Sequence, residues 1–84
     1  MFATDYQALT DGFVCGEATA DGTPSYIKGV SDAATPATVL RNRNGCDAAD
    51  GDMGLCFPVK KGDYWKVTKD TTNAGYIFWI PLEP

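Results

Sequence analysis

The run YIFWI at residues 76–80 is apolar at every position, and it constrains the fold more than any other stretch of the chain. The side chains of a strand alternate between two faces. The run therefore has two apolar faces, one with Tyr76, Phe78 and Ile80 and the other with Ile77 and Trp79. A strand of this kind must be covered on both sides.

In a two-layer domain of 84 residues without predicted helices, one face of each sheet normally meets water. The second face of residues 76–80 then needs a cover, which is either a long loop of the same chain or another subunit. We favour a subunit interface, because exposed apolar patches of more than a few hundred Å² usually mark contacts. Burying about 250 Å² more of aromatic surface would contribute roughly 6 kcal/mol before ordering costs. The run thus predicts a homo-oligomer.

The rest of the chain is also typical of β structure, with nine Gly and five Pro between short runs of Val, Ile, Thr and aromatic residues. The predicted strands cover about residues 5–9, 13–18, 26–30, 38–43, 53 or 55 to 59, 64–68 and 76–82. We expect antiparallel pairing, because parallel pairs need long crossover connections. The predicted fold class is all-β: one domain, residues 1–84, forming a small antiparallel β-sandwich or jelly-roll of about seven short strands.

The hairpin centred on residues 60–63 shows the alternation most clearly. Leu55, Phe57 and Val59 share one face of its first strand, and Trp65 and Val67 share one face of its second. Gly62 suits a positive φ in the turn. Two other segments predict loops: residues 31–36, where Pro36 stops any helix, and the glycine- and aspartate-rich residues 44–54.

The composition excludes several classes of function. The chain has no histidine, so imidazole bases and imidazole metal ligands are absent. Three cysteines alone cannot complete a four-ligand zinc site. No glycine-rich phosphate-binding loop occurs. Paired carboxylates are the remaining route to catalysis, and so small a domain has little room for a cleft. We expect a protein that is not an enzyme and has no cofactor.

The charge and hydropathy of the chain exclude two kinds of partner. There are 11 acidic and 7 basic side chains, which gives a formal net charge of −4. Nucleic-acid binders usually carry a basic excess, and so do proteins bound to anionic membranes. No apolar run approaches the ~20 residues that span a bilayer. We therefore expect no nucleic acid and no membrane insertion. The first residues also lack the basic and apolar regions of a signal peptide.

Three aspartates, Asp47, Asp50 and Asp52, lie in the loop 44–54. Clustered carboxylates can bind calcium, but this spacing is not that of a known calcium loop. We expect a solvated, charged loop and no metal. Cys46 and Cys56 bracket the loop, and two alternatives stay open for them. Either they form a disulfide and Cys15 is single, or all three cysteines are reduced.

Residues beside this loop form the predicted ligand site. Arg41 and Arg43 are two positions apart, so they share one face of a predicted strand. They could hydrogen-bond sugar hydroxyls or an acidic glycan, or they could pair with surface carboxylates, where ion pairs contribute little. The candidate ligand-binding residues are Arg41, Arg43, Asn44, Asp50 and Asp52. Exposed tyrosines would mark a sugar platform, and the candidates are Tyr6, Tyr26, Tyr64 and Tyr76.

Three segments together resemble a known family. Residues 56–67, CFPVKKGDYWKV, resemble a "PV-x-K-G-x-Y-W-K-V" hairpin, residues 77–82, IFWIPL, resemble a "W-I-P-L" ending, and residues 10–14, TDGFV, resemble a first core strand. These motifs are similar to those of the small β domains at the ends of bacteriophage tail fibres and related virion appendages. The resemblance implies a trimeric β-sandwich or jelly-roll knob that presents loops to a cell surface.

The expected function follows from this resemblance. It is a non-enzymatic virion appendage domain, at a tail-fibre or spike tip, that binds a host cell-surface glycan or protein. The alternative is a structural capsid or tail decoration protein that binds other virion proteins, and a third is a free-standing lectin. We expect synthesis in the host cytoplasm and a final location in the virion. The expected partners are sister copies in a homotrimer and other virion proteins.

Overall fold

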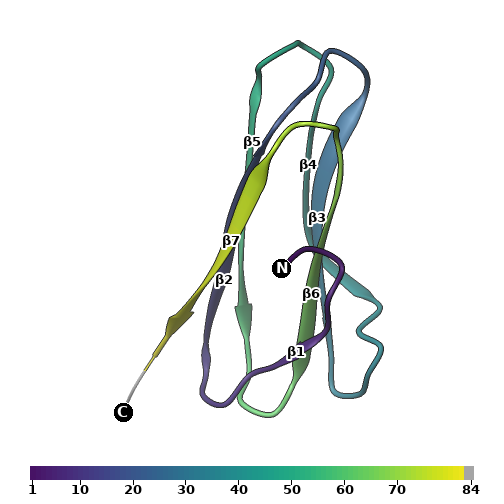
Figure 1. Ribbon diagram of the computed structural model, residues 1–84. Coiled ribbons are helices and arrows are strands. Elements are labelled where there is room, and N and C mark those ends of the chain that lie inside the picture. The colour runs from purple at the N-terminus through teal and green to yellow at the C-terminus, as the bar shows by residue number, and fades with distance from the viewer. Residues whose placement is uncertain (83–84) are drawn as a thin grey trace.

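Seven strands form two antiparallel sheets in the computed structural model, which describes residues 1–82 (Figure 1). In chain order, the strands are β1 (Tyr6–Gln7), β2 (Gly12–Thr19), β3 (Ser25–Asp32), β4 (Val39–Cys46), β5 (Asp52–Val59), β6 (Tyr64–Asp70) and β7 (Gly75–Pro81). One sheet has the order β1-β6-β3-β4 and the other has the order β5-β2-β7. The predicted all-β sandwich of seven antiparallel strands is confirmed.

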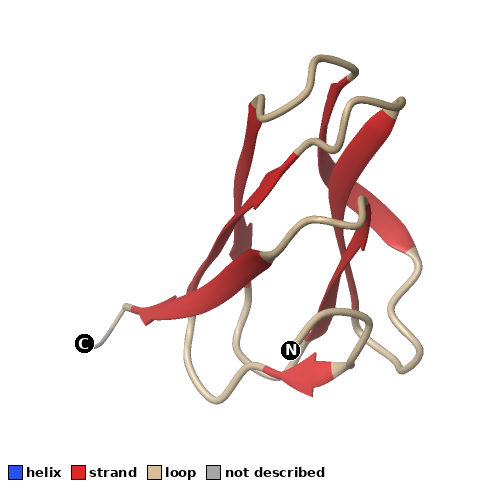
Figure 2. Cartoon of the chain, turned by 45° about the horizontal axis from the view of Figure 1, so that its top comes forward, coloured by secondary structure: helices blue, strands red, loops and turns tan. Residues whose placement is uncertain are grey.

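The boundaries of the strands differ from the prediction in the middle of the chain. We expected residues 44–54 to be one irregular loop, but β4 continues to Cys46 and β5 begins at Asp52. The reason is pairing: β3 offers β4 partners as far as Ser25, which lies opposite Cys46. Cross-strand hydrogen bonding thus overrides the weak strand propensity of this polar, glycine-containing segment. Strands and loops account for residues 1–82, and no helix fit to cross a membrane occurs among them (Figure 2).

The core lies between the two sheets and follows the alternation expected from the sequence. Leu55, Phe57 and Val59 of β5 are buried while their neighbours in the strand are exposed, as predicted. Trp65 and Val67 of β6, which belongs to the four-stranded sheet, are also buried, as predicted. The buried cluster consists of Ala8, Val14, Ala18, Ala20, Ile27, Met53, Leu55, Phe57, Val59, Trp65 and Val67.

Two glycines are required by geometry. Gly29 of β3 lies directly against the ring of Phe57 from the opposite sheet, so any Cβ at this position would overlap the ring. Gly62 has a φ of 91° in the β5–β6 turn, a backbone conformation that favours glycine. The positive φ expected at Gly62 is confirmed.

One side of the sandwich is closed by side-chain amides. Asn42 Nδ2 of β4 donates to the carbonyl oxygen of Cys56 at 2.8 Å, and Asn44 Nδ2 donates to that of Gly54 at 3.0 Å. Both acceptors belong to β5, the edge strand of the other sheet. The two asparagines thus satisfy carbonyls that would otherwise be an open sheet edge. β7, the other edge strand of the three-stranded sheet, pairs with β2 alone.

Asp21 ties two loops together at one end of the sandwich. Its carboxylate accepts hydrogen bonds from the backbone N–H and hydroxyl of Thr23 and, in the β6–β7 loop, from the same two groups of Thr72. The Ser25 hydroxyl also donates to it, at 3.1 Å. These bonds, led by the Thr23 hydroxyl and the backbone N–H of Thr72, hold the pKa of Asp21 well below its ordinary value.

The lowered pKa predicts that Asp21 stabilises the fold at neutral pH and less in acid. A carboxyl whose pKa is lower in the folded state contributes stability above its unfolded pKa of about 3.9, and loses that contribution as the pH falls below this value. Asp21→Asn should therefore lower Tm at pH 7, and the gap to the unsubstituted protein should narrow toward pH 2. Thermal unfolding across this pH range measures the effect. A gap that stays constant would contradict the proposed charge-dependent bonding.

Candidate functional site

The outer face of the three-stranded sheet is an apolar surface. Three outward residues of its central strand β2, Phe13, Cys15 and Glu17, lie opposite Pro58, Cys56 and Gly54 of β5 and opposite Ile80, Phe78 and Tyr76 of β7. The exposed fractions are 55% for Tyr76, 47% for Phe78, 42% for Ile80 and 37% for Phe13. We call this surface the apolar face and define it by Phe13, Cys15, Cys56, Pro58, Tyr76, Phe78 and Ile80.

The carboxylate next to the apolar face already has a partner. The Tyr76 hydroxyl donates a hydrogen bond to Glu17 Oε2 at 3.0 Å. This bond, together with the negative charge of Glu17, raises the pKa of Tyr76 above its ordinary value. The pairing leaves the aromatic rings of Tyr76 and Phe78, whose centroids are 6.0 Å apart, as the main features of this part of the surface.

The opposite face of β7 packs on the core of the same chain. Ile77 and Trp79 are half-buried against the core cluster, and the Trp79 ring stacks on Trp65 at 6.0 Å. Of the two covers considered for residues 76–80, the long loop of the same chain is wrong, because Tyr76, Phe78 and Ile80 are exposed. The predicted interface residues thus divide: three face outward, while Ile77 and Trp79 serve the protomer's own core.

A cleft of about 350 Å³ lies beside β7. β7 pairs with β2 on one side only, and the strand carries no charged residue. Trp65 and Tyr6, whose rings stack at 4.7 Å, line the cleft together with Trp79. Natural edge strands are usually protected by charges, bulges or a covering segment. This side of the sandwich is therefore open and apolar, in contrast to the side closed by the two asparagines.

The predicted ligand site is not assembled. We expected Arg41 and Arg43 on one face, but a β-bulge shifts the register between Gly29 and Val30, and Arg41 is the extra residue of β4. The Arg41 side chain turns to Ser31 and donates to its hydroxyl at 2.8 Å. Arg43 instead lies over the ring of Tyr26, on the outer face of the four-stranded sheet. The prediction was wrong because a bulge breaks the two-residue period.

The other predicted ligand residues are also dispersed. Asn44 is engaged in the bridge to β5. Asp50 and Asp52 are exposed at the end of the sandwich that holds Asp21, and the Asp50 backbone N–H donates to the carbonyl of Ala20. Within residues 1–82, no group of three or more Cys, Asp or Glu side chains lies close enough together to hold a metal ion.

The cysteine pairing differs from both predicted alternatives. Cys15 and Cys56 form a disulfide, and Cys46 is free. The predicted Cys46–Cys56 bond is wrong because Cys56 lies directly opposite Cys15 in the β2–β5 register, while Cys46 ends a strand of the other sheet. By the chain-entropy estimate, closing a loop over a separation of 41 residues contributes about 4 kcal/mol to stability. The bond also lies in the middle of the apolar face.

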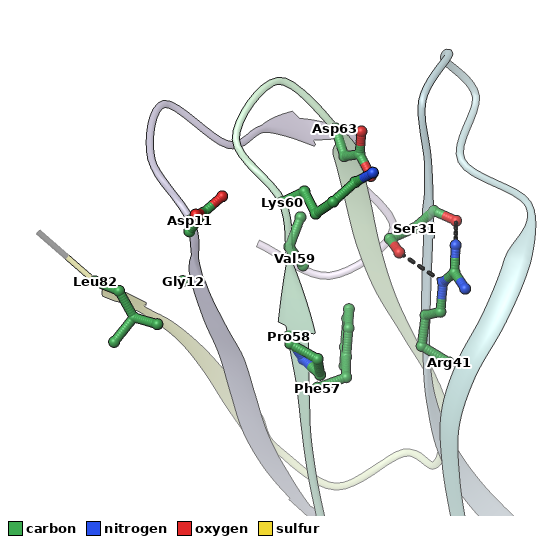
Figure 3. Close-up of a pocket in the computed structure, with 10 residues that line it drawn as sticks. All are labelled: Asp11, Gly12, Ser31, Arg41, Phe57, Pro58, Val59, Lys60, Asp63 and Leu82. Carbon is green, nitrogen blue, oxygen red and sulfur yellow. Dashed lines mark hydrogen bonds between the residues drawn. The ribbon is translucent and has the colours of Figure 1, made fainter. Parts of the chain in front are cut away.

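An open groove of about 700 Å³ lies between the sheets at the end opposite Asp21 (Figure 3). Two of its polar side chains, those of Arg41 and Asp11, are engaged in hydrogen bonds. Arg41 contacts both the hydroxyl and the carbonyl of Ser31, and Asp11 Oδ1 accepts the backbone N–H of Lys61. In Figure 3, Arg41 bends toward Ser31 along the wall of the groove. The groove offers no nucleophile paired with a base among these groups.

One cluster was missed by the sequence analysis. Tyr26 and Lys28 are two positions apart and therefore lie on the same face of β3. Arg43 of β4 lies opposite Lys28. The Tyr26–Lys28 spacing was visible in the sequence, but the position of Arg43 depends on the strand register.

The chain was compared with protein-family models, curated proteins and solved structures, and none of the three comparisons found a match.

The disulfide predicts a definite thiol count. Protein purified without reductant and then denatured should react with one maleimide per chain, and peptide mapping should place the label on Cys46. Cys46→Ser should abolish labelling, because Cys15 and Cys56 are both consumed by their bond. A label on Cys15 in the unreduced protein, or labels on all three cysteines, would contradict the pairing.

Proposed function

We propose that this chain is a non-enzymatic, self-associating binding domain of a bacteriophage virion appendage, whose surfaces away from the apolar face contact the host cell. The observation that carries the proposal is the apolar face itself. The motifs at residues 10–14, 56–67 and 77–82, which resemble those of tail-fibre end domains, support the choice of an appendage. The trimer remains an expectation from that resemblance.

The size of the apolar face supports self-association. Its four large exposed side chains, Phe13, Tyr76, Phe78 and Ile80, together expose on the order of 350 Å². This is within the range of the largest patches on monomers, which are often functional. A standard interface buries about 800 Å² on each partner, so the face supplies the apolar centre of one and needs additional contacts.

The open side beside β7 can supply those contacts. The unprotected edge of β7 adjoins the apolar face, because Phe78 lines the cleft and also belongs to that face. A sister copy that covers the face would also reach the β7 edge and the cleft with Trp65 and Trp79. One contact would then cover the apolar rings and the unpaired backbone groups together, which is why we favour a second copy as the partner.

The apolar face would also suit a different virion protein, and this makes a structural decoration protein the second candidate. In that case the face contacts the particle and the domain has no receptor. The two candidates share the surface and differ in what the assembled protein binds, so one experiment must measure mass and another must measure binding.

Self-association predicts a mass above that of one chain. Light scattering at micromolar concentration should show an oligomer, and Phe78→Ser should weaken association by about 60-fold for each interface that buries the ring, since it removes roughly 100 Å² of exposed ring from the apolar face. Leu40→Ser is the matched control, because Leu40 is 54% exposed on the other sheet. It should leave the mass unchanged. A monomeric unsubstituted protein would overturn the proposal.

The receptor role predicts cell binding. Fluorescently labelled protein should bind the surface of host bacteria and should be competed by unlabelled protein. Purified phage particles are the second target. Labelling of cells supports an appendage tip, whereas binding to particles with no labelling of cells shows a decoration protein and overturns the receptor role.

A further inference from the structure

The outer face of the four-stranded sheet holds two cations in an unfavourable position. Lys28 of β3 lies directly opposite Arg43 of β4. Like charges directly opposite on neighbouring strands destabilise a sheet. Both are near one aromatic ring: Lys28 Nζ is 5.4 Å and Arg43 Cζ is 5.1 Å from the centroid of Tyr26. The ring offsets part of the repulsion, because its face attracts cations.

The partners of these two cations differ in kind from those of other cations in the chain. By register, Asp70 of β6 lies opposite Tyr26 and diagonally from Lys28. Other cations have polar partners: Arg41 binds Ser31, and Lys69 binds the carbonyls of Thr71 and Asn73. Lys69 also lies over an aromatic ring, that of Phe2, at 5.5 Å. Lys28 and Arg43 differ from these cations because they share one ring and lie opposite each other on neighbouring strands.

The surroundings leave the cluster accessible. Tyr26 lies opposite Gly45 on β4, so the side chain that reaches its ring from that strand is Arg43, which is exposed, while Tyr26 and Lys28 are half-buried. On β6, Asp70 lies opposite Tyr26, and Thr68 lies opposite Lys28. Lys66 lies opposite Val30 and adds a third cation to this face. Three of the seven basic side chains thus gather on one face of a chain with net charge −4.

We propose that Tyr26, Lys28 and Arg43 form a binding site for an acidic saccharide. Its carboxylate or phosphate would lie between the ammonium and the guanidinium, and its sugar ring would pack against the part of the Tyr26 ring that the two cations leave uncovered. Arginine binds either anion in bidentate geometry, and an anion between the two cations removes their repulsion. Asp70, beside the ring, is placed to accept a sugar hydroxyl. The proposal rests on the proposed function, because it names the host ligand.

The site also predicts a division between stability and binding. Lys28→Gln or Arg43→Gln removes the repulsion together with one cation–ring contact, so Tm should stay within about 2 °C of the unsubstituted value. Each change should nevertheless weaken binding of the acidic saccharide at least tenfold. A role in the fold alone would lower Tm and leave binding intact. Lys61→Gln, in the β5–β6 turn, is the matched control with the same loss of charge.

Calorimetric titration with four probes tests the site: oligogalacturonate, phosphomannan, neutral maltoheptaose and polyglutamate. The expected result is binding of one or both acidic saccharides, lost in the Lys28 and Arg43 variants and kept in Lys61→Gln. The first two probes distinguish a carboxylate from a phosphate ligand. Absence of binding to both, equally tight binding of polyglutamate, or unchanged binding by the variants would overturn the proposal.

The failure of this site is distinguishable from failure of the receptor role. If the unsubstituted protein and both variants label host cells equally, the receptor role stands and the Tyr26 site is wrong. If the unsubstituted protein binds an acidic saccharide and labels no cells, the site stands as chemistry and the receptor role is wrong. Loss of cell labelling in Lys28→Gln and Arg43→Gln alone supports both.

Discussion

The number of sheet faces is the constraint on which the rest of this structure depends. Two sheets have four faces, and one core between them covers two. The chain has no helix among residues 1–82 with which to cover a third. Whatever side chains lie outside the core must therefore suit either water or a partner. The two outer faces resolve this in opposite ways, one with aromatic and aliphatic side chains and the other with cations around a single ring.

The two edges of the three-stranded sheet show the same contrast. Asn42 and Asn44 donate to carbonyls of β5 and close that side, while β7 keeps an uncharged, unpaired edge beside an apolar cleft. The disulfide between Cys15 and Cys56 fixes β2 to β5 at the centre of the apolar face. The bond thus joins two of the three strands that carry the apolar face. A rigid, preformed surface loses less entropy on association than a flexible one.

Much of the fold was predictable because burial has a local pattern. The alternation of Leu55, Phe57 and Val59 with their exposed neighbours predicted both the strand and its buried face, and the structure confirms each.

The candidate ligand site was far less predictable than the fold. Arg41 and Arg43 were expected together, and one extra residue in β4 sent them to opposite sides of the sheet. Nearness in the chain made Cys46–Cys56 one of the two alternatives for the cysteines, whereas the β2–β5 register joins Cys15 to Cys56, 41 positions apart.

The sequence by itself determined the class of fold, the buried faces of the strands and the presence of an apolar surface too large for the core. These depend on the period of two along a strand, which is a property of neighbouring residues. The tertiary structure alone decided which half of residues 76–80 faces outward, which cysteines bond and which cations meet at Tyr26. These depend on register and on one bulge, because pairing between distant strands sets which side chains become neighbours.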